Sequence, residues 1–400
     1  MRVAVFNSFD ITPAENGGEI RLINLYSRLS QTDPVRFLSY DLRCKQPIQR
    51  QRVAPALDIV DTMVTDSDRW VFFQANERLG LHPHDVLCID AYTFSAQFLH
   101  EVDRMLRWAD VVVCTHPYLA TVIFPRCTPL QLRVFEAHNI ELHAKTSFFA
   151  PAKDRALAGA LLSTTRRAEA YALEVADIVL TVGERDSEGF VAEYGVDPAK
   201  LHVVPNGVSV GAYDAISAEA CAAFRAEAGL AESDVGVFLG SAYGPNVDAY
   251  KEARAWLDAA GFDGTIFVIG RIADVFDESW PAVGFTEKWL GFVDAATKHL
   301  LVKSADFAIQ IVTSGGGTNL KLFDYMAAGT PIIANAFGRR GVSDDNWFIA
   351  VETDTDMRNI VRTRQWRGEA AKASAEVARS IALRDFDWDS IAKRYRTILA

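Results

Sequence analysis

The sequence of 400 residues is poor in cysteine, and its five cysteines are widely spaced, with no C-x-x-C pair. Such spacing excludes the disulfide framework of a small secreted protein and the usual zinc-binding patterns. No apolar run approaches the ~20 residues of a membrane-spanning helix. The N-terminus carries one arginine, a short apolar strand and then Asp10 and Glu15, which is unlike a signal peptide. We therefore expect a cytoplasmic protein with free, buried cysteines.

An excess of positive charge is also missing, because 52 acidic residues outnumber 41 lysines and arginines and give a net charge of −11. Neutralising nucleic-acid phosphates needs clustered basic residues, so nucleic-acid binding is not expected. Acidic stretches at 354–356 and 385–389 fit a turn and a helix start, and no metal site is predicted. Half of the residues are hydrophobic, as in globular proteins, and the length suits two domains.

Short apolar runs alternate with stretches of helical spacing through the first half of the chain. This alternation is typical of a parallel sheet that is covered on both faces. The helical spacing is clearest at residues 20–30 and 94–106. We expect strands at residues 2–7, 35–40, 86–89, 111–115, 132–136, 177–182 and 201–204.

A turn signal, Pro205-Asn206-Gly207, separates this series from a second one. We predict an α/β protein with two Rossmann-like, doubly wound parallel-sheet domains, residues 1–206 and 207–384. Residues 385–400 have helical spacing and are expected to pack back onto the first domain or to end the second. In the second series we expect strands at 235–240, 265–270, 307–312, 331–334 and 348–351, and helices at 247–260, 295–303, 320–328 and 369–382.

The most informative stretch is the glycine-rich one at 313–331, which follows a predicted strand and opens a predicted helix. Its three consecutive glycines let the backbone approach a ligand, and the free N–H groups at a helix start form an anion site. Lys321 adds a positive charge near the helix start, and the Asp324 carboxylate can accept hydrogen bonds from adjacent hydroxyls, as on a ribose. The spacing fits neither a Walker A loop nor G-x-G-x-x-G. The stretch predicts a site for a diphosphate and a sugar.

Three weaker patterns precede it. Gly17 and Gly18 open a predicted helix, and Arg21 on that helix can hold a phosphate or a carboxylate. His138 follows the strand at 132–136, and the carboxyl ends of parallel strands line ligand crevices. Residues 43–52 contain four cations and no acid. They are expected to form a solvated loop, or else to contact anionic lipid head groups or a charged acceptor.

These motifs together resemble those of a known family. In chain order they are the Gly-Gly pair, E-A-H-N at 136–139, A-D-I-V-L-T-V at 176–182, H-V-V-P-N-G-V at 202–208, and G-G-G-T-N-L-K-L-F-D-Y-M-A-A-G-T-P at 315–331. The order resembles the retaining nucleotide-sugar glycosyltransferases of family four, which have the GT-B fold. The resemblance spans nearly the whole chain. It implies that the second domain holds the donor in a cleft between the domains, and that the acceptor enters from the first domain.

The resemblance extends to single residues. Asp324 matches the second acid of the family's E-x(7)-E motif, which binds the donor ribose, and His138 matches a histidine near the transferred sugar. Residues 241–246 resemble the first loop of the family's C-terminal domain. From the residues and the resemblance together, we expect catalytic roles for His138, Lys321 and Arg21. We expect donor-binding roles for Gly17, Gly18, Asn206, Ser241, Asn246, Arg271, Ser314, Gly315, Gly316, Gly317, Thr318, Asn319, Leu320 and Asp324.

The sequence departs from the family pattern in three ways. The second acid of the motif is Asp324 rather than a glutamate, so its reach is shorter by one methylene group. Gly316 stands where the motif has its first glutamate, so the sugar hydroxyls need other partners, such as backbone N–H groups or nearby hydroxyls. The loop at 241–246 also lacks the cation that many relatives carry there. Arg271, Arg21 or Lys321 is expected to supply that charge.

The implied activity is transfer of a sugar from a nucleotide-diphosphate sugar to a glycan or glycolipid, with retention of the anomeric configuration. The family suggests a role in surface polysaccharide or lipopolysaccharide assembly. No visible motif requires a cofactor or a metal, and the basic residues 43–52 leave open peripheral contact with the inner face of the membrane. Two alternatives remain open. One is a nucleotide-sugar 2-epimerase on the same scaffold, and the other is a non-catalytic nucleotide-sugar-binding subunit.

Overall fold

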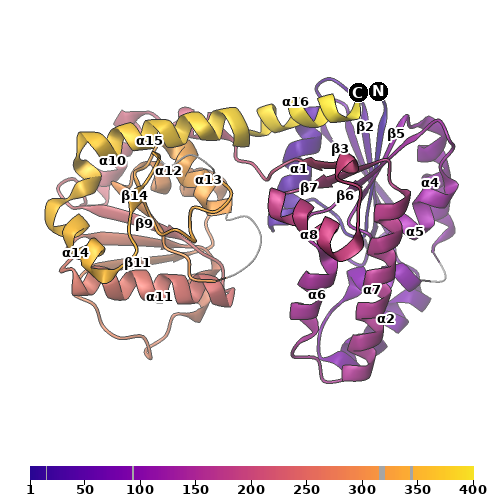
Figure 1. Ribbon diagram of the computed structural model, residues 1–400, viewed down its shortest axis with the longest axis horizontal. Helices are drawn as coiled ribbons and strands as arrows, with labels where there is room; N and C mark the ends of the chain where they lie inside the picture. The colour runs from indigo at the N-terminus through magenta and orange to yellow at the C-terminus, as the bar shows by residue number, and fades with distance from the viewer. Residues whose placement is uncertain (15, 92–93, 315–319, 343–345) are drawn as a thin grey trace. The chain divides into compact units, whose positions relative to one another are not determined.

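A computed structural model describes residues 1–14, 16–91, 94–314, 320–342 and 346–400. The chain divides into two compact units (Figure 1). The first unit contains Met1–Pro205 and Ile391–Ala400, and the second contains Asn206–Ser390. The glycine-rich residues 315–319 lie outside the described part of the chain.

The first unit is built on a sheet of eight strands in the order β3-β4-β2-β1-β5-β6-β7-β8. All neighbouring strands are parallel except β3 and β4, which are antiparallel. The central strands are buried along their whole length, as expected for a sheet covered on both faces. The strands are β1 (Val3–Asn7), β2 (Val35–Asp41), β3 (Ile48–Ala54), β4 (Leu57–Met63), β5 (Val111–Thr115), β6 (Leu132–Glu136), β7 (Ile178–Thr181) and β8 (Leu201–Val203).

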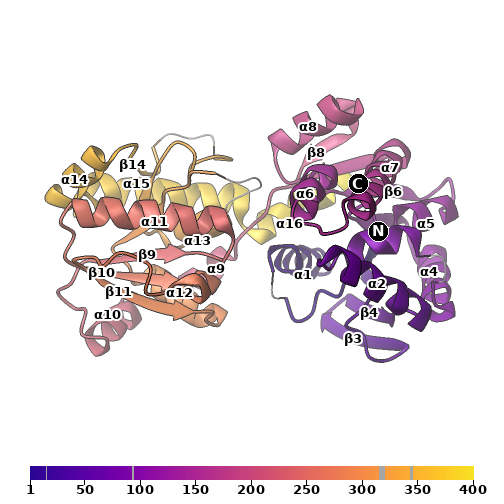
Figure 2. The same ribbon diagram turned by 90° about the horizontal axis from the view of Figure 1, so that it is seen from below.

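Helices lie on both sides of this sheet (Figures 1 and 2). On one face, apolar side chains of the strands and of the helices that cover them form a core that includes Phe6, Leu38 and Phe98. On the other face, Val3, Val5 and Phe37 of the strands are buried, as are Leu22 and Leu25 of α1. The helices are α1 (Gly17–Leu29), α2 (Asp66–Leu79), α3 (His84–Leu87), α4 (Ala96–Trp108), α5 (Ala120–Ile123), α6 (Glu141–Phe149), α7 (Arg155–Val175) and α8 (Glu184–Tyr194).

The second unit has a fully parallel sheet in the order β11-β10-β9-β12-β13-β14. Figure 2 shows α11 on one side of this sheet and α12 on the other. The strands are β9 (Val235–Leu239), β10 (Thr265–Ile269), β11 (Thr286–Gly291), β12 (Phe307–Gln310), β13 (Ile332–Ala334) and β14 (Ile349–Ala350). The helices are α9 (Val210–Asp214), α10 (Ala218–Glu227), α11 (Gly244–Ala259), α12 (Ala295–Lys303), α13 (Leu320–Ala328), α14 (Asp354–Thr363) and α15 (Glu369–Ile381).

The last helix, α16 (Trp388–Leu399), enters the first unit at Ile391. The hydroxyls of Tyr395 and Tyr26 lie 2.9 Å apart in the core of that unit, and the Nε of Arg396 donates to the Oδ2 of Asp33 at 2.6 Å. No helix in the described ranges combines the length and the apolar character that a membrane span requires. All five cysteines are free, and Cys44, Cys88 and Cys114 are buried.

The predicted doubly wound parallel sheets are confirmed, with three corrections. Residues 86–89 are not a strand, because they belong to α3 and a following 3₁₀ turn, Cys88–Asp90. A short apolar run fits a buried helix as well as a strand. Residues 48–52 are not loop, because they form most of β3 against the edge of β4. An edge strand tolerates charged side chains that face solvent. Strands β4 and β11 were not expected.

Each strand order reverses once. In the first unit the chain turns back between β1 and β5, and in the second unit it turns back between β9 and β12. Loops that leave two such neighbouring strands diverge to opposite faces of the sheet. A ligand crevice is therefore expected at the carboxyl ends of these strand pairs.

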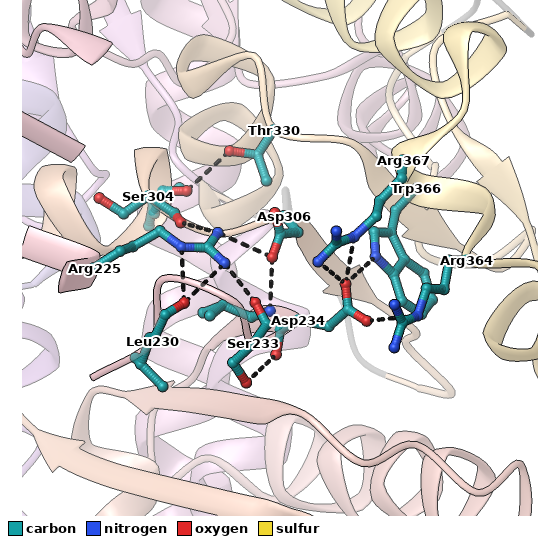
Figure 3. A network of polar contacts seen from close by, with 12 residues as sticks. Arg225, Leu230, Ser233, Asp234, Ser304, Asp306, Thr330, Arg364, Trp366 and Arg367 are labelled. Atoms are coloured by element: carbon teal, nitrogen blue, oxygen red, sulfur yellow. Dashed lines mark hydrogen bonds and ion pairs between the residues drawn. The ribbon is translucent and has the colours of Figure 1, made fainter. Parts of the chain in front are cut away.

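The amino ends of β9 and β12 are joined by buried polar contacts (Figure 3). The Asp234 carboxylate accepts from the indole Nε1 of Trp366 at 3.1 Å, from the Nε of Arg367 at 2.7 Å, and lies 3.0 Å from the Nε of Arg364. The Asp306 carboxylate accepts from the backbone N–H of Val235 at 2.8 Å. This network holds the last part of the second unit to the start of its central strands.

We predict that Asp234→Ala destabilises the second unit. The arginines are half exposed and can be rehydrated, but Trp366 is 2% exposed and its indole N–H loses its acceptor. A buried donor left without a partner costs about 1–3 kcal/mol. Urea unfolding followed by tryptophan fluorescence measures the loss. Glu369→Ala removes an exposed carboxylate of the same unit and is expected to leave the midpoint unchanged; equal effects of both changes would contradict the prediction.

Candidate functional site

One group of candidate residues lies at the carboxyl ends of β9, β10 and β12 in the second unit. Gly270 follows β10 with φ +105°, and a Cβ placed there would lie 2.2 Å from the carbonyl oxygen of Gly240. The ends of β9 and β10 therefore approach more closely than side chains would allow. Arg271 comes next in the chain and is exposed, and it makes no ion pair with the residues that the structure describes.

Hydrogen bonds fix the backbone just before the glycine-rich segment, at residues 310–312. The side-chain amide of Asn335 accepts from the backbone N–H of Val312 at 3.1 Å and donates to the carbonyl of Val312 at 2.8 Å. The Nε2 of Gln310 donates to the carbonyl of Gly338 at 3.0 Å. The candidate residues Gly315, Gly316, Gly317, Thr318 and Asn319 follow, outside the described residues, and Ser314 before them is exposed.

Lys321 is the second residue of α13 and reaches the first turn of α11, the helix that follows β9. Residues 244–246 are therefore not loop, because they form the start of α11. Its Nζ donates to the Oδ1 of Asn246 at 3.1 Å and lies 4.1 Å from the ring centroid of Phe238. The Nδ2 of Asn246 in turn donates to the Oγ of Ser241 at 2.9 Å. No carboxylate in the described ranges pairs with Lys321, and burial lowers the pKa of its ammonium group to about 7. The structure thus brings together Ser241, Asn246 and Lys321.

Asp324 lies three residues further along α13. Its Oδ1 accepts from the hydroxyl of Tyr213 at 2.6 Å and from the Nζ of Lys298 at 2.8 Å. Both donors use the same oxygen, and within the described part of the chain no hydrogen bond reaches Oδ2. The carboxylate is therefore held in position while one oxygen can still accept a hydrogen bond from a ligand. Leu320 and Asn206 are partly buried.

A separate group of candidate residues lies in the first unit, at the start of α1 and the carboxyl ends of β5 and β6. Asn16 caps α1, and its side chain and that of Glu19 form a capping box. A Cβ placed on Gly18 would lie 3.7 Å from the Nδ1 of His138. The structure therefore places the glycine pair and His138 side by side, although they are far apart in the sequence. Gly17 and Gly18 are partly buried.

Arg21 is 1% exposed and makes internal contacts. Its Nε donates to the Oε1 of Glu136 at 2.9 Å, and one of its terminal nitrogens donates to the carbonyl of Pro205 at 2.8 Å. The hydroxyl of Tyr26 donates to the other oxygen of Glu136 at 2.5 Å. Burial alone would raise the pKa of Glu136, but the charge of Arg21 and the hydrogen-bond donors around it lower the pKa to about 2. Glu136 is thus a fixed anion in the core.

His138 lies next to this anion, with its Nε2 3.7 Å from the Oε1 of Glu136. Burial lowers the pKa of His138, although Glu136 opposes the shift. The ring of His116 is 4.3 Å from that of His138, and burial together with His138 lowers the pKa of His116 to about 4. Both rings are therefore neutral at pH 7. His116 also has φ +66°, an uncommon backbone conformation for a residue with a side chain.

Sequence reasoning did not assign roles to several residues of this arrangement. Glu136 and His116 lie close together because Thr115, which precedes His116, pairs with Glu136 at the ends of β5 and β6. The contacts of Tyr213 and Lys298 with Asp324 have no signal in the sequence, because α9 and α12 reach Asp324 only through the fold. Within the described ranges, no group of three His, Cys, Asp or Glu side chains could hold a metal ion.

No known family model matches the sequence, and no curated protein matches it. Solved structures do resemble it over the whole chain. Sucrose-phosphate synthase from Thermosynechococcus elongatus has a TM-score of 0.70 at 15% identity, covering 100% of this chain and 98% of that one. Anabaena HepE in complex with UDP has a TM-score of 0.64 at 15% identity, with 100% and 99% covered.

A third similar structure is WaaG, a glycosyltransferase involved in lipopolysaccharide biosynthesis. Its TM-score is 0.64 at 15% identity, and all of both chains is covered. Identities this low establish the fold and not the activity. The chain therefore has the GT-B fold, as the order of its motifs implied.

Proposed function

We propose that the protein is a retaining glycosyltransferase that moves a sugar from a nucleotide-diphosphate sugar to a glycan or lipid-linked acceptor. The observation that carries the proposal is Lys321. It is an ammonium group with no carboxylate partner among the described residues, held at the carboxyl end of the second unit's sheet where the strand order reverses. An ammonium group in this position can bind an anionic ligand.

A diphosphate fits this position for a second reason. Lys321 lies in the first turn of α13, and the first N–H groups of a helix carry a partial positive charge. The donor diphosphate would thus meet a full and a partial positive charge together. Residues 241–246 contain no cation of their own, and Lys321 contacts Asn246 among them. We infer that Lys321 supplies the charge that this segment lacks.

Asp324 fits the sugar of a nucleotide. Its Oδ1 is held by Tyr213 and Lys298, so the carboxylate cannot rotate freely. Oδ2 would accept a hydrogen bond from a ribose hydroxyl, and charge-assisted hydrogen bonds of this kind are among the stronger ones. We assign Asp324 to ribose binding on this ground.

The chemical step breaks the anomeric C–O bond and leaves negative charge on the departing nucleotide diphosphate. Preorganised positive groups stabilise that charge, and electrostatic stabilisation is usually the largest contribution to catalysis. We assign this role to Lys321. His138 is neutral, so we assign it hydrogen bonding to the sugar or the diphosphate. Arg21 would act as a positioning residue, because its contacts hold Glu136 beside His138.

The comparisons support the substrate class. Structures of HepE contain UDP, UDP-glucose, or UDP with glucose, and the E. coli trehalose-6-phosphate protein is bound with UDP-2-fluoro glucose. WaaG takes part in lipopolysaccharide biosynthesis. These proteins share the fold of this chain, and the candidate site offers groups suited to the same kind of donor. A glycan or glycolipid of a surface polysaccharide is the acceptor class we propose.

The test of the activity is release of nucleotide diphosphate that depends on an added acceptor. UDP-glucose, ADP-glucose and GDP-mannose are each incubated with a panel of glycan and glycolipid acceptors, and released nucleotide and product are measured by chromatography. We expect sugar transfer with one donor class and only slow donor hydrolysis without acceptor. Interconversion of the sugar without any acceptor would instead show the epimerase, and tight binding with no turnover would show the binding subunit.

We predict that Asp324→Asn weakens binding of the preferred nucleotide diphosphate by about tenfold, roughly 1.4 kcal/mol. The amide keeps the shape of the side chain but loses the charge that strengthens the hydrogen bond to the ribose. Isothermal titration calorimetry measures the affinity. Tyr213→Phe keeps the carboxylate and the Lys298 contact, and we expect only a small loss. An Asp324→Asn protein that binds as tightly as the parent chain would refute the assignment.

Lys321 generates a pH prediction. Because its folded pKa is lowered from 10.5 to about 7, the folded protein binds fewer protons than the unfolded chain between those values. Lys321 therefore makes the free energy of unfolding rise with pH over that range, by at most ~1.4 kcal/mol per pH unit. Below pH 7 the charged Lys321 lowers the free energy of unfolding most. Lys321→Met should raise the melting temperature, more at pH 6 than at pH 10.

We expect the parent chain to bind nucleotide diphosphate less tightly above pH 7, where Lys321 loses its charge. Lys321→Met should weaken this binding and remove its dependence on pH in that range. Lys372→Met removes an exposed lysine of the second unit and serves as the matched control. We expect it to change neither the pH profile nor the affinity. If the affinity of the parent chain and that of Lys321→Met change with pH in the same way, Lys321 does not contact the diphosphate.

A further inference from the structure

A cavity of about 310 Å³ in the first unit is lined by four arginines. Arg36 lies on β2, Arg50 and Arg52 lie on β3, and Arg104 lies on α4. The sequence analysis noted the basic run that contains Arg50 and Arg52, but the proposed transferase activity does not use it. The fold adds two arginines from elsewhere in the chain to this run.

Only two carboxylates face these four arginines among the residues that the structure describes. Glu101 on α4 accepts from Arg50 and also pairs with Arg104 at 2.6 Å. Asp58 on β4 accepts from the Nε of Arg52 at 2.7 Å. The cavity and its carboxylates together therefore carry two more positive charges than negative ones. This surplus is unusual in a chain with a net charge of −11.

The side chain of Arg36 carries one of these two surplus charges, and the other arises because Arg50 and Arg104 share Glu101. Arg36 makes no hydrogen bond or ion pair with the residues that the structure describes, and its guanidinium lies 4.1 Å from the ring centroid of Trp108. It is partly buried, and burial together with the charge of Arg104 lowers the pKa of Arg36 below its ordinary value. The stacking on Trp108 holds the guanidinium plane and leaves its N–H donors available to an anion.

The cavity is separate from the candidate catalytic site. Arg36 is the second residue of β2 and pairs in register with Asp58, the second residue of β4, so the cavity lies near the amino ends of these strands. The glycine pair and His138 lie at the opposite, carboxyl edge of the same sheet. A ligand in the cavity would therefore not be the group that reacts.

We propose that this cavity binds a phosphate group, carried either by a free phosphorylated compound or by a phospholipid head group. A phosphate offers oxygens to several guanidinium groups at once, and arginine matches its geometry through paired N–H donors. The bound anion would offset the repulsion between Arg36 and Arg104. Gln51, which also lines the cavity, adds an uncharged amide to the site.

The first experiment titrates the full-length protein with inorganic phosphate in a calorimeter, at constant ionic strength set with chloride. We expect one saturable site. Arg36→Gln and Arg104→Gln should each weaken phosphate binding by about tenfold or more, as expected for the loss of a charge-assisted contact worth roughly 1.4 kcal/mol. Arg78→Gln removes an arginine that pairs with Asp154 outside the cavity, and should bind phosphate like the parent chain.

The second experiment distinguishes the two sources of phosphate. Flotation with vesicles of phosphatidylglycerol and phosphatidylcholine is compared with flotation on phosphatidylcholine alone, using the same variants. Recruitment that needs the anionic lipid and is lost in Arg36→Gln and Arg104→Gln identifies a head group. Calorimetric binding without recruitment identifies a free phosphorylated compound. The proposal is overturned if neither form of phosphate binds, or if both cavity variants bind as the parent chain and Arg78→Gln do.

Discussion

The reversal of strand order in each sheet is the constraint on which the candidate site depends. In the second unit β9 and β12 are neighbours, but the chain leaves them toward opposite faces. The loop after β9 and the segment after β12 must therefore separate, and their backbone groups are left beside a space that helices do not fill. Lys321 and Asn246 meet there although 75 residues separate them in the sequence.

A partly buried lysine without a carboxylate partner among the described residues is costly, and this cost points to a function for the residue. Most of the ionised groups in the two cores are compensated, as Glu136 is by Arg21 and Asp234 is by Arg364 and Arg367. Lys321 is an exception, with only an amide oxygen and the ring of Phe238 beside it among the described residues. Folds retain such local conflicts at sites where function needs them. A ligand that brings negative charge would remove the conflict, which is why Lys321 argues for an anionic substrate.

The sequence predicted the alternating architecture well, because parallel strands buried on both faces are near-continuous apolar runs. Residues 111–115 and 295–303 were predicted with their observed bounds. The predictions were wrong or missing where local pattern is ambiguous, as at 86–89, or where a strand at or near a sheet edge carries polar residues, as in β3 and β11. For the site, the strand-loop-helix order placed Lys321, Asp324 and His138 near strand ends. It could not show Tyr213 and Lys298 on Asp324, because those contacts arise only from tertiary packing.

The Lys321 site and the arginine cavity both hold positive charge away from bulk water, but they differ in how that charge is kept. At Lys321 a single ammonium group stands alone, so burial makes its charge depend on pH near neutrality. In the arginine cavity the guanidinium groups stay charged, because the pKa of arginine is too high for partial burial to neutralise it. There Glu101 and Asp58 reduce the repulsion instead, and a surplus of charge remains. The cavity thus offers a permanent charge, whereas an anion bound at Lys321 would itself stabilise the charge that holds it.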